Sequence, residues 1–237
     1  MKFVHIADTH LDSPFTGLSN INNLDDIRRL EQRKALKKMI EYIKENDIDY
    51  LFIAGDFYEH EYIRKSTIQY VNNLFKEIEK TKIFITPGNH DPYIKNSYYD
   101  TFEWADNVHI CKEKIEIIHE SEIDFYLTGF TDFYMNQSPI ENVQIENINK
   151  TNILISHCDL NGSKDENGFC YNPILEAKMN SLKFNYIAMG HIHKTNFKEN
   201  SKIVYPGSTI SFGFDELGEH GMVVRRNKKT WFAYRIY

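Results

Sequence analysis

Two histidines, His191 and His193, flank a single isoleucine directly after the apolar run "YIAMG". Side chains at positions i and i+2 of an extended segment point to the same side, so both imidazoles are expected to face one spot. A lone histidine beside a core is usually a hydrogen-bonded core residue. A facing pair is more typical of metal binding, because neutral imidazole is the commonest metal-binding side chain. The pair predicts a metal site, provided that other segments supply further ligands.

Four other apolar segments also end in Asp, Asn or His. In α/β sheets, ligands bind beyond the carboxyl ends of the strands, and a sheet brings these ends together however far apart they are in sequence. Each fragment alone has an ordinary explanation; "GNHD" could be a turn, since Asn and Gly suit left-handed positions. All five together are hard to explain by core packing, because unpaired carboxylates and imidazoles are costly to bury. The residues that follow these four segments are Asp8 and His10, Asp56 and Glu59, Asn89, His90 and Asp91, and His157 and Asp159.

The number of candidate ligands indicates more than one ion. A mononuclear catalytic zinc takes about three protein ligands and a water. Two ions about 3.5–4 Å apart, bridged by one carboxylate, account for a larger set. Mixed imidazole and carboxylate ligation favours Mn, Fe or Zn over Mg or Ca. We therefore expect two divalent metal ions, with Mn²⁺ as the first expectation and Fe or Zn as alternatives. The candidate ligands are Asp8, His10, Asp56, Asn89, His157, His191 and His193.

Short apolar runs rich in β-branched and aromatic residues predict the strands that carry these ligands. Because the runs are continuously apolar, both faces of each sheet are expected to be covered. Between the first strands, two stripes at helical spacing predict amphipathic helices that face the core. The predicted strands are 3–7, 50–55, 82–88, 125–130, 152–156, 186–190 and 202–208, and the stripes are Leu36, Met39, Ile40 and Ile43, and Ile68, Val71, Phe75 and Ile78.

The alternation of strand and helix over residues 3–86 predicts an α/β layered unit with right-handed crossovers. The second half is richer in strands, with one helix near 173–182 and a closing hairpin around "NKK" (227–229). Polar stretches at 135–151 and 159–172 predict loops. No repeat or linker divides the chain, so a single domain over 1–237 is expected.

The composition is that of a soluble globular protein: 41% of the 237 residues are hydrophobic and 26% are charged. With a net charge of −6, the chain lacks the overall positive charge of a non-specific nucleic-acid binder. Binding of DNA would therefore need a local basic patch, a metal or a partner. The three cysteines form no CxxC motif, and reduced thiols are expected. No signal peptide and no run near the roughly 18 apolar residues of a membrane span is present. These features predict a cytoplasmic protein without membrane contact.

The ordered set "ADTH", "AGD", "PGNHD", "SH" and "GHIH" resembles the calcineurin-type metallophosphoesterase superfamily, over residues 4–213. The resemblance implies a four-layer α-β-β-α sandwich with two mixed sheets and a dinuclear metal site at the strand ends. In detail, it implies one metal on Asp8, His10 and His193, a second on Asn89, His157 and His191, and Asp56 as the bridge.

The same resemblance implies that His90 contacts the phosphate and can donate a proton. A histidine beside two cations needs a neighbouring acid to hold its proton. The family often has an Asp or His three residues after the bridging Asp, and here Glu59 stands at that position. A solvated loop carboxylate is the alternative interpretation of Glu59.

Two further stretches, "HIADTHLDSPFTGL" (5–18) and "YPGSTISFGFDELGEHG" (205–221), resemble the bacterial DNA-repair exonuclease branch with its SbcD-type nuclease subunits. That resemblance implies an ATPase partner subunit and a homodimer. The branch typically continues into a capping domain, of which this sequence shows no evident trace. DNA is therefore not assured as the substrate by the catalytic motifs alone.

Three functions follow as hypotheses. The first is a phosphodiesterase or exonuclease in which a metal-activated water attacks phosphorus in line. The second is a phosphomonoesterase or small-nucleotide phosphohydrolase on the same site. The third, a non-catalytic scaffold, is disfavoured because all seven ligands and His90 are present. No cysteine nucleophile is required, and Cys158 is expected to pack away from the ligand side.

Other residues near the motifs have two interpretations. Lys194, Lys164, Arg64 and His60 could contact phosphate oxygens, but a solvated surface is the expected role of each. Tyr93 and the stretch "NSYYD" (96–100) could stack nucleobases, or could simply pack after the third strand.

Overall fold

The computed structural model describes residues 1–15, 23–162, 168–213, 216–225 and 231–235. Its helices are α1 (Leu24–Glu45), α2 (Lys65–Lys76), α3 (Tyr98–Thr101) and α4 (Glu176–Ser181), with a 3-10 helix, η2 (Pro139–Asn142). Its strands are β1 (Phe3–Ile6), β2 (Tyr50–Ala54), β3 (Lys82–Thr86), β4 (Val108–Ile110), β5 (Glu116–His119), β6 (Ile123–Thr128), β7 (Thr151–His157), β8 (Tyr186–Gly190), β9 (Ile203–Val204), β10 (Gly221–Arg225) and β11 (Trp231–Arg235).

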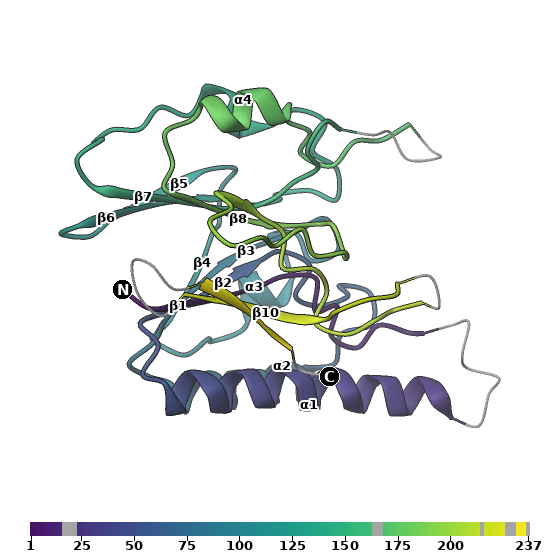
Figure 1. Ribbon diagram of the computed structural model, residues 1–237. Helices are drawn as coiled ribbons and strands as arrows, with labels where there is room; N and C mark the ends of the chain where they lie inside the picture. Colours follow the sequence, from purple (N-terminus) through teal and green to yellow (C-terminus); the bar gives the residue numbers. More distant parts are fainter. Residues whose placement is uncertain (16–22, 163–167, 214–215, 226–230, 236–237) are drawn as a thin grey trace.

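The first sheet has six strands in the order β11-β10-β1-β2-β3-β4. Strands β1 to β4 run parallel to one another, and β10 pairs with β1 in the antiparallel direction. Helices α1 and α2 cover its outer face (Figure 1). The two predicted stripes lie there, buried among side chains such as Val4, Leu51 and Ile85 of the sheet. The predicted helices and their core-facing sides are confirmed.

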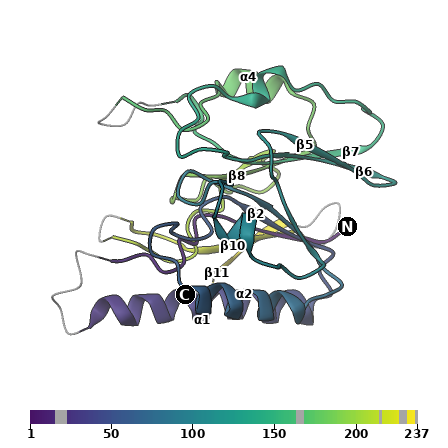
Figure 2. The ribbon, with the colours of Figure 1, turned by 180° about the vertical axis from the view of Figure 1, so that it is seen from behind.

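The second sheet has five strands in the order β5-β6-β7-β8-β9, all parallel except β5. Helix α4 lies over its outer face, on the side away from the first sheet, as both views show (Figures 1 and 2). Met179 of α4 and Ile140 of η2 pack there against Leu154 and Ile187 of the sheet. This outer layer contains less helix than the α1 and α2 layer, because α4 has only six residues against 22 and 12.

Aromatic side chains fill the space between the two sheets. Phe52 and Phe84 of the first sheet stack with ring centroids 6.3 Å apart, and Phe84 lies 4.7 Å from Phe125 of the second sheet. Each fully buried side chain of this size contributes about 1.5–3 kcal/mol of hydrophobic stabilisation. Both faces of both sheets are therefore covered, and the expected four-layer α-β-β-α sandwich with two mixed sheets is confirmed.

The structure also differs from the sequence-based prediction in its short elements. Strands β4 and β5 were not predicted, because three or four half-exposed residues with interspersed His and Glu give no apolar run. The polar stretch 135–151 contains η2, which begins after Ser138, whose side chain accepts a hydrogen bond from the Ile140 backbone. The closing hairpin is confirmed by β10 and β11, and its expected turn at 227–229 lies outside the described residues.

Among the helices that the structure describes, none combines the length and hydrophobicity that crossing a bilayer requires.

Candidate metal centre

The carboxyl ends of strands from both sheets meet at one edge of the sandwich. Strand β2 packs against β7 and β8 across the sheet interface. His157, at the end of β7, donates from Nδ1 to the carbonyl oxygen of Ala54, at the end of β2, over 3.0 Å. The backbone N–H of His191, just after β8, donates to the Asp8 carboxylate at 3.0 Å. Hydrogen bonds therefore join the loops of the two sheets directly at the predicted ligands.

The backbone at these strand ends is left-handed, not extended. Asp8, His10 and Asp56 have φ values of 50°, 44° and 48°, and His191 has a φ of 103°. The expectation that His191 and His193 face one spot because they lie in an extended segment is wrong, since β8 ends at Gly190 and the chain turns at His191. Such conformations cost about 1–3 kcal/mol each and collect at functional sites. Hydrogen bonds from Asp8 N to Gly55 O (3.1 Å) and from His10 N to Asp56 O (2.9 Å) hold the left-handed backbone at Asp8 and His10 in place.

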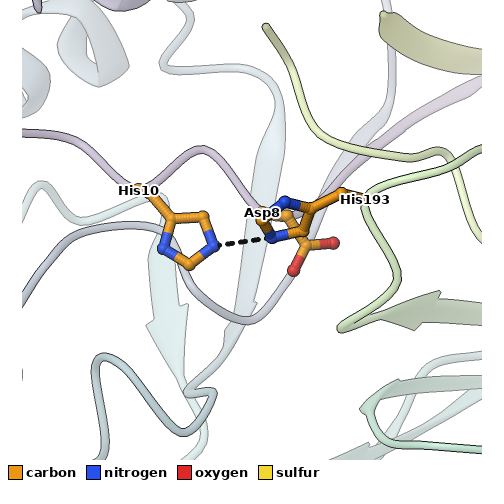
Figure 3. A group of neighbouring side chains, drawn as sticks. All are labelled: Asp8, His10 and His193. Carbon is orange, nitrogen blue, oxygen red and sulfur yellow. Dashed lines mark hydrogen bonds between the residues drawn. The ribbon is translucent and has the colours of Figure 1, made fainter. Parts of the chain in front are cut away.

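A first cluster contains Asp8, His10 and His193, whose candidate ligand atoms all lie within 4.8 Å of one another (Figure 3). The Nε2 atoms of His10 and His193 are 3.1 Å apart. Each ring's Nδ1 faces a carboxylate: that of Glu59 at 2.7 Å for His10 and that of Glu216 at 2.5 Å for His193. A neutral imidazole that donates from Nδ1 has a lone pair on Nε2. Two lone pairs therefore converge beside the Asp8 carboxylate, an arrangement that fits a divalent cation.

A second cluster contains Asp56, His157 and His191, again with ligand atoms within 4.8 Å. Asn89 joins it, because its Oδ1 lies 3.0 Å from His157 Nε2. Burial opposes the charged form of His157, but the Asp56 carboxylate outweighs it and raises the His157 pKa to about 9. Burial and the nearby His157 lower the pKa of His191 to about 3, which keeps that imidazole neutral and available as a ligand. The donor set of Asp, Asn and two His fits a borderline divalent metal.

The Asp56 carboxylate lies between the two clusters. Its Oδ2 is 3.2 Å from His157 Nε2 and 3.7 Å from His10 Nε2. Its Oδ1 accepts a hydrogen bond from the His90 backbone at 2.8 Å. One oxygen therefore faces a histidine of each cluster, while the other is held by the loop after β3.

Glu59 is not a solvated loop carboxylate: its side chain is only 16% exposed. One oxygen accepts from His10 Nδ1, and the other lies 3.0 Å from His90 Nδ1. Burial opposes ionisation of Glu59, but the bonds with His10 and His90 outweigh it and lower its pKa to about 2. Burial likewise opposes the imidazolium of His90, yet Glu59 and Asp56 raise the His90 pKa to about 9. Bound cations would lower that value by like-charge repulsion.

Two positioning residues were missed by the sequence-based prediction. Asp91, noted only as the last residue of "GNHD", is fully buried and accepts from the backbone N–H groups of Asp56 (3.0 Å) and Gly88 (2.7 Å) and from the Tyr99 hydroxyl (2.7 Å). Glu216 reaches His193 from a segment 23 residues further along the chain. Asp91 could have been found, because it is part of the "GNHD" motif and directly follows His90. Glu216 lies in the stretch 205–221, but no local pattern in the sequence indicates that it contacts His193.

The remaining candidates lie elsewhere. Tyr99 is buried and bonded to Asp91, so the 96–100 stretch packs after β3 and does not offer Tyr99 for stacking. Cys158 packs in the outer cluster, with its sulfur 3.7 Å from that of Met189, as expected. Lys194 and Arg64 are exposed, and Lys164 lies outside the described residues.

A family model of the calcineurin-like phosphoesterases matches residues 1–195, so the chain belongs to this family, and its class is that of phosphoester hydrolases that use divalent metals. The expected family membership is confirmed.

Three known proteins illustrate the similarity. The uncharacterized metallophosphoesterase YhaO of Bacillus subtilis is 26% identical over 234 residues, which is 93% of this chain and 56% of YhaO. The SbcD subunit of the nuclease SbcCD from Staphylococcus epidermidis is 27% identical over 253 residues, or 92% of this chain and 64% of SbcD. The chain thus spans less than two thirds of either relative. A solved structure of an archaeal phosphodiesterase matches with a TM-score of 0.52 and 16% identity over 98% of both chains, which supports the fold.

Proposed function

We propose that this protein hydrolyses phosphodiesters with two divalent cations, with Mn²⁺ as the first candidate and Fe or Zn as alternatives. Asp8, His10 and His193 would hold one ion, and Asn89, His157 and His191 the other. The observation that carries the proposal is the place of Asp56, whose Oδ2 faces a histidine of each cluster at 3.2 and 3.7 Å. A single carboxylate shared in this way is what a dinuclear centre requires.

The residues around the ions have distinct tasks in this proposal. The cations would lower the pKa of a water and neutralise charge on the phosphate. His90 contacts the phosphate and gives a proton to the leaving oxygen, as a general acid. Glu59 accepts from His90 Nδ1, which fixes the ring and leaves Nε2 to carry the transferable proton. Because Glu59 also bonds His10, the proton donor and the first cluster share one anchor.

More specifically, we propose that the protein is a DNA-repair-type exonuclease or a related phosphodiesterase. The likeness to the SbcD subunit of the SbcCD nuclease supports this choice and the proposal of a partner protein. The ATPase nature of that partner and a homodimer rest on the sequence resemblance. A single catalytic domain over 1–237 is supported by β10, which pairs with β1 and so joins the two ends of the described chain in one sheet.

The test is a substrate panel on metal-loaded protein with parallel metal analysis. Bis(p-nitrophenyl) phosphate and single-stranded DNA should be hydrolysed faster than p-nitrophenyl phosphate, and the reverse order would favour the phosphomonoesterase alternative. Asp56→Asn should reduce bound metal from two ions per chain and lower kcat by about 100-fold or more, because it weakens both clusters. Asp106→Asn, an exposed carboxamide control, should keep both ions. Two ions per chain in Asp56→Asn would contradict the bridging role.

A further inference from the structure

An open cavity of about 520 Å³ adjoins the metal centre on the side of His90. The volume falls within the range of small-molecule sites. Its walls come from the loops after β2 and β3 and from two segments beyond β6 and β7. The residues that line it are Glu59, His60, Glu61, Tyr62, Asn89, His90, Phe133, Tyr134 and Tyr171. His90 and Asn89 thus belong both to the cavity and to the proposed centre.

One side of the cavity is an aromatic wall, formed by Phe133, Tyr134 and Tyr171. Tyr134 stacks on Phe169 with centroids 4.1 Å apart and planes inclined by 20°, and it lies 6.2 Å from the Tyr171 ring. Tyr134 is nevertheless 49% exposed, so the rest of its surface is open. Exposed aromatic surface grouped beside a cavity marks a binding site more often than chance.

The backbone holds this wall against the metal centre. Met135 forms an isolated bridge with Tyr171, and the Asn172 backbone N–H donates to Met135 O at 2.6 Å. The Asn172 side chain donates in turn to the carbonyl oxygen of His157, a proposed metal ligand, at 2.8 Å. Tyr171 also packs 5.5 Å from the His191 ring. The wall is therefore fixed relative to the ligands and is not a separate surface feature.

The charge of the cavity narrows the chemistry of its occupant. The nine lining residues include no Lys or Arg, and they include the carboxylates of Glu59 and Glu61. His90 serves the reacting phosphate, and with no Lys or Arg in the lining a chain of further phosphates would find no cationic partner there. A cationic group would find no buried free carboxylate, because both oxygens of Glu59 already face histidines and Glu61 is exposed to solvent. The near-parallel stacking of Tyr134 on Phe169 shows that this ring accepts a flat aromatic partner on its face. A flat, uncharged, aromatic group fits best.

We infer that this cavity holds an unstacked nucleobase of the substrate, attached on the leaving-oxygen side of the phosphodiester. The inference rests on the proposed function, since His90 places the leaving oxygen at the mouth of the cavity. It makes the substrate a single-stranded nucleotide phosphodiester, because a base within a duplex keeps its faces covered by its neighbours. One base on an aromatic side chain changes affinity by about 5- to 150-fold.

The experiment compares a thymidine tetranucleotide with an abasic tetramer of the same backbone and charge. With Mn²⁺ we measure KM for hydrolysis, and with Ca²⁺ in its place we measure Kd by tyrosine fluorescence. The wild-type protein should prefer the thymidine tetramer by about 5-fold or more in both measurements. Tyr134→Leu, which keeps apolar bulk without a ring, should bring the preference close to one. Tyr134→Phe should retain it.

Tyr70→Leu is the matched control, because this partly buried tyrosine lies on α2, away from the cavity. It should keep the wild-type preference, and the melting temperature of each variant shows that it is folded. Equal KM and Kd for both tetramers in the wild type, or an unchanged preference in Tyr134→Leu, would overturn the inference. Base-dependent binding without hydrolysis of any substrate would instead contradict the proposed function and support the assignment of the cavity.

Discussion

At the scale of single residues, carboxylates that are not proposed to bind metal determine which nitrogen each histidine presents. Glu59 and Glu216 accept from the Nδ1 atoms of His10 and His193, and in both rings Nε2 is left facing the first cluster. Orienting partners of this kind usually cost about 10- to 100-fold in metal affinity or activity when they are removed. The selection of the tautomer, more than the mere presence of histidines, makes the cluster suitable for a cation.

The proposed proton-donor role of His90 can be separated from simple phosphate contact by the choice of leaving group. We expect His90→Ala to lower kcat by about 10²–10⁴-fold on single-stranded DNA, whose alkoxide leaving group needs a proton. The loss on bis(p-nitrophenyl) phosphate should be much smaller, since p-nitrophenolate leaves without protonation. Steady-state kinetics on the two substrates measure the difference.

His109→Ala is the control for this comparison. His109 lies on the edge strand β4, bonded to Glu116 at 2.8 Å, and its removal should leave both rates near those of the wild type. An equal loss on both substrates in His90→Ala would indicate that His90 only binds the phosphate.

At the scale of elements, the site depends on how closely β8 approaches β2. A Cβ atom at Gly190 would lie 1.8 Å from Ala54 O and 2.9 Å from His157 Nδ1. Gly190 therefore allows the Ala54 carbonyl to accept from His157, which directs His157 Nε2 toward Asp56 and Asn89. The glycine before the two histidines is a requirement of packing at the sheet interface.

We expect Gly190→Ala to push β8 away from β2 and to break the bond between His157 and Ala54. The overpacking should destabilise the fold by about 1–3 kcal/mol, and the metal content of the second cluster should fall. Urea denaturation and metal analysis provide the two readouts. Gly168→Ala serves as the comparison: its Cβ would meet nothing within 4 Å, although its φ of 82° carries a conformational cost. Full metal content in Gly190→Ala would contradict this account.

Much of this arrangement could be predicted from the sequence, because its signals are local. An apolar run that ends in Asp, Asn or His marks both a strand and its functional end, so Asp8, Asp56 and His157 could be placed on one edge without coordinates. The left-handed turn at His191 could not be predicted, because the positive φ falls on the histidine and not on the glycine that precedes it.

The features that escaped prediction depend on contacts between distant segments. Glu216 gains its role only when the segment after β9 folds back onto His193, and Asp91 only when the loops after β2 and β3 meet. The sequence suggests stacking only at Tyr93 and 96–100, with packing as the alternative, whereas the aromatic residues that line the cavity include Phe133, Tyr134 and Tyr171. Composition alone does not distinguish a tyrosine such as Tyr99, which is buried under the loops, from one such as Tyr134, which is open to a cavity.

At the scale of the whole molecule, the candidate metal centre lies at the interface between the two sheets that also holds the fold together. The candidate ligands come from loops of both sheets, and the sheets are held together behind them by aromatic packing. A cation that binds only this assembled edge stabilises the folded state by mass action. A fall in pH should destabilise the folded sheets as well as the candidate metal centre. A carboxylate that is remote from the candidate metal ligands allows the two effects to be separated.

Asp124, on β6, is such a carboxylate: it is 1% exposed and accepts from Lys150 Nζ at 2.8 Å and lies 3.0 Å from His119 Nδ1. Burial opposes its ionisation, but the bonds with Lys150 and His119 outweigh burial and lower the Asp124 pKa. A pKa that is lower in the folded than in the unfolded chain gives stability that is complete well above the unfolded value of about 4 and is lost as pH falls through the folded value.

We therefore expect Asp124→Asn to lower the free energy of unfolding by about 1–3 kcal/mol at pH 7, because it leaves Lys150 without its buried charge partner. The difference from the wild type should shrink as the pH falls below about 4, first because the unfolded chain takes up the proton on this carboxylate and then because the folded protein does so at its lower pKa. Urea titrations of both proteins at a series of pH values, without added metal, measure it. Asp106→Asn should remain within about 0.5 kcal/mol of the wild type throughout, because Asp106 is exposed. A difference for Asp124→Asn that stays constant into acid would show that its carboxylate charge does not stabilise the fold.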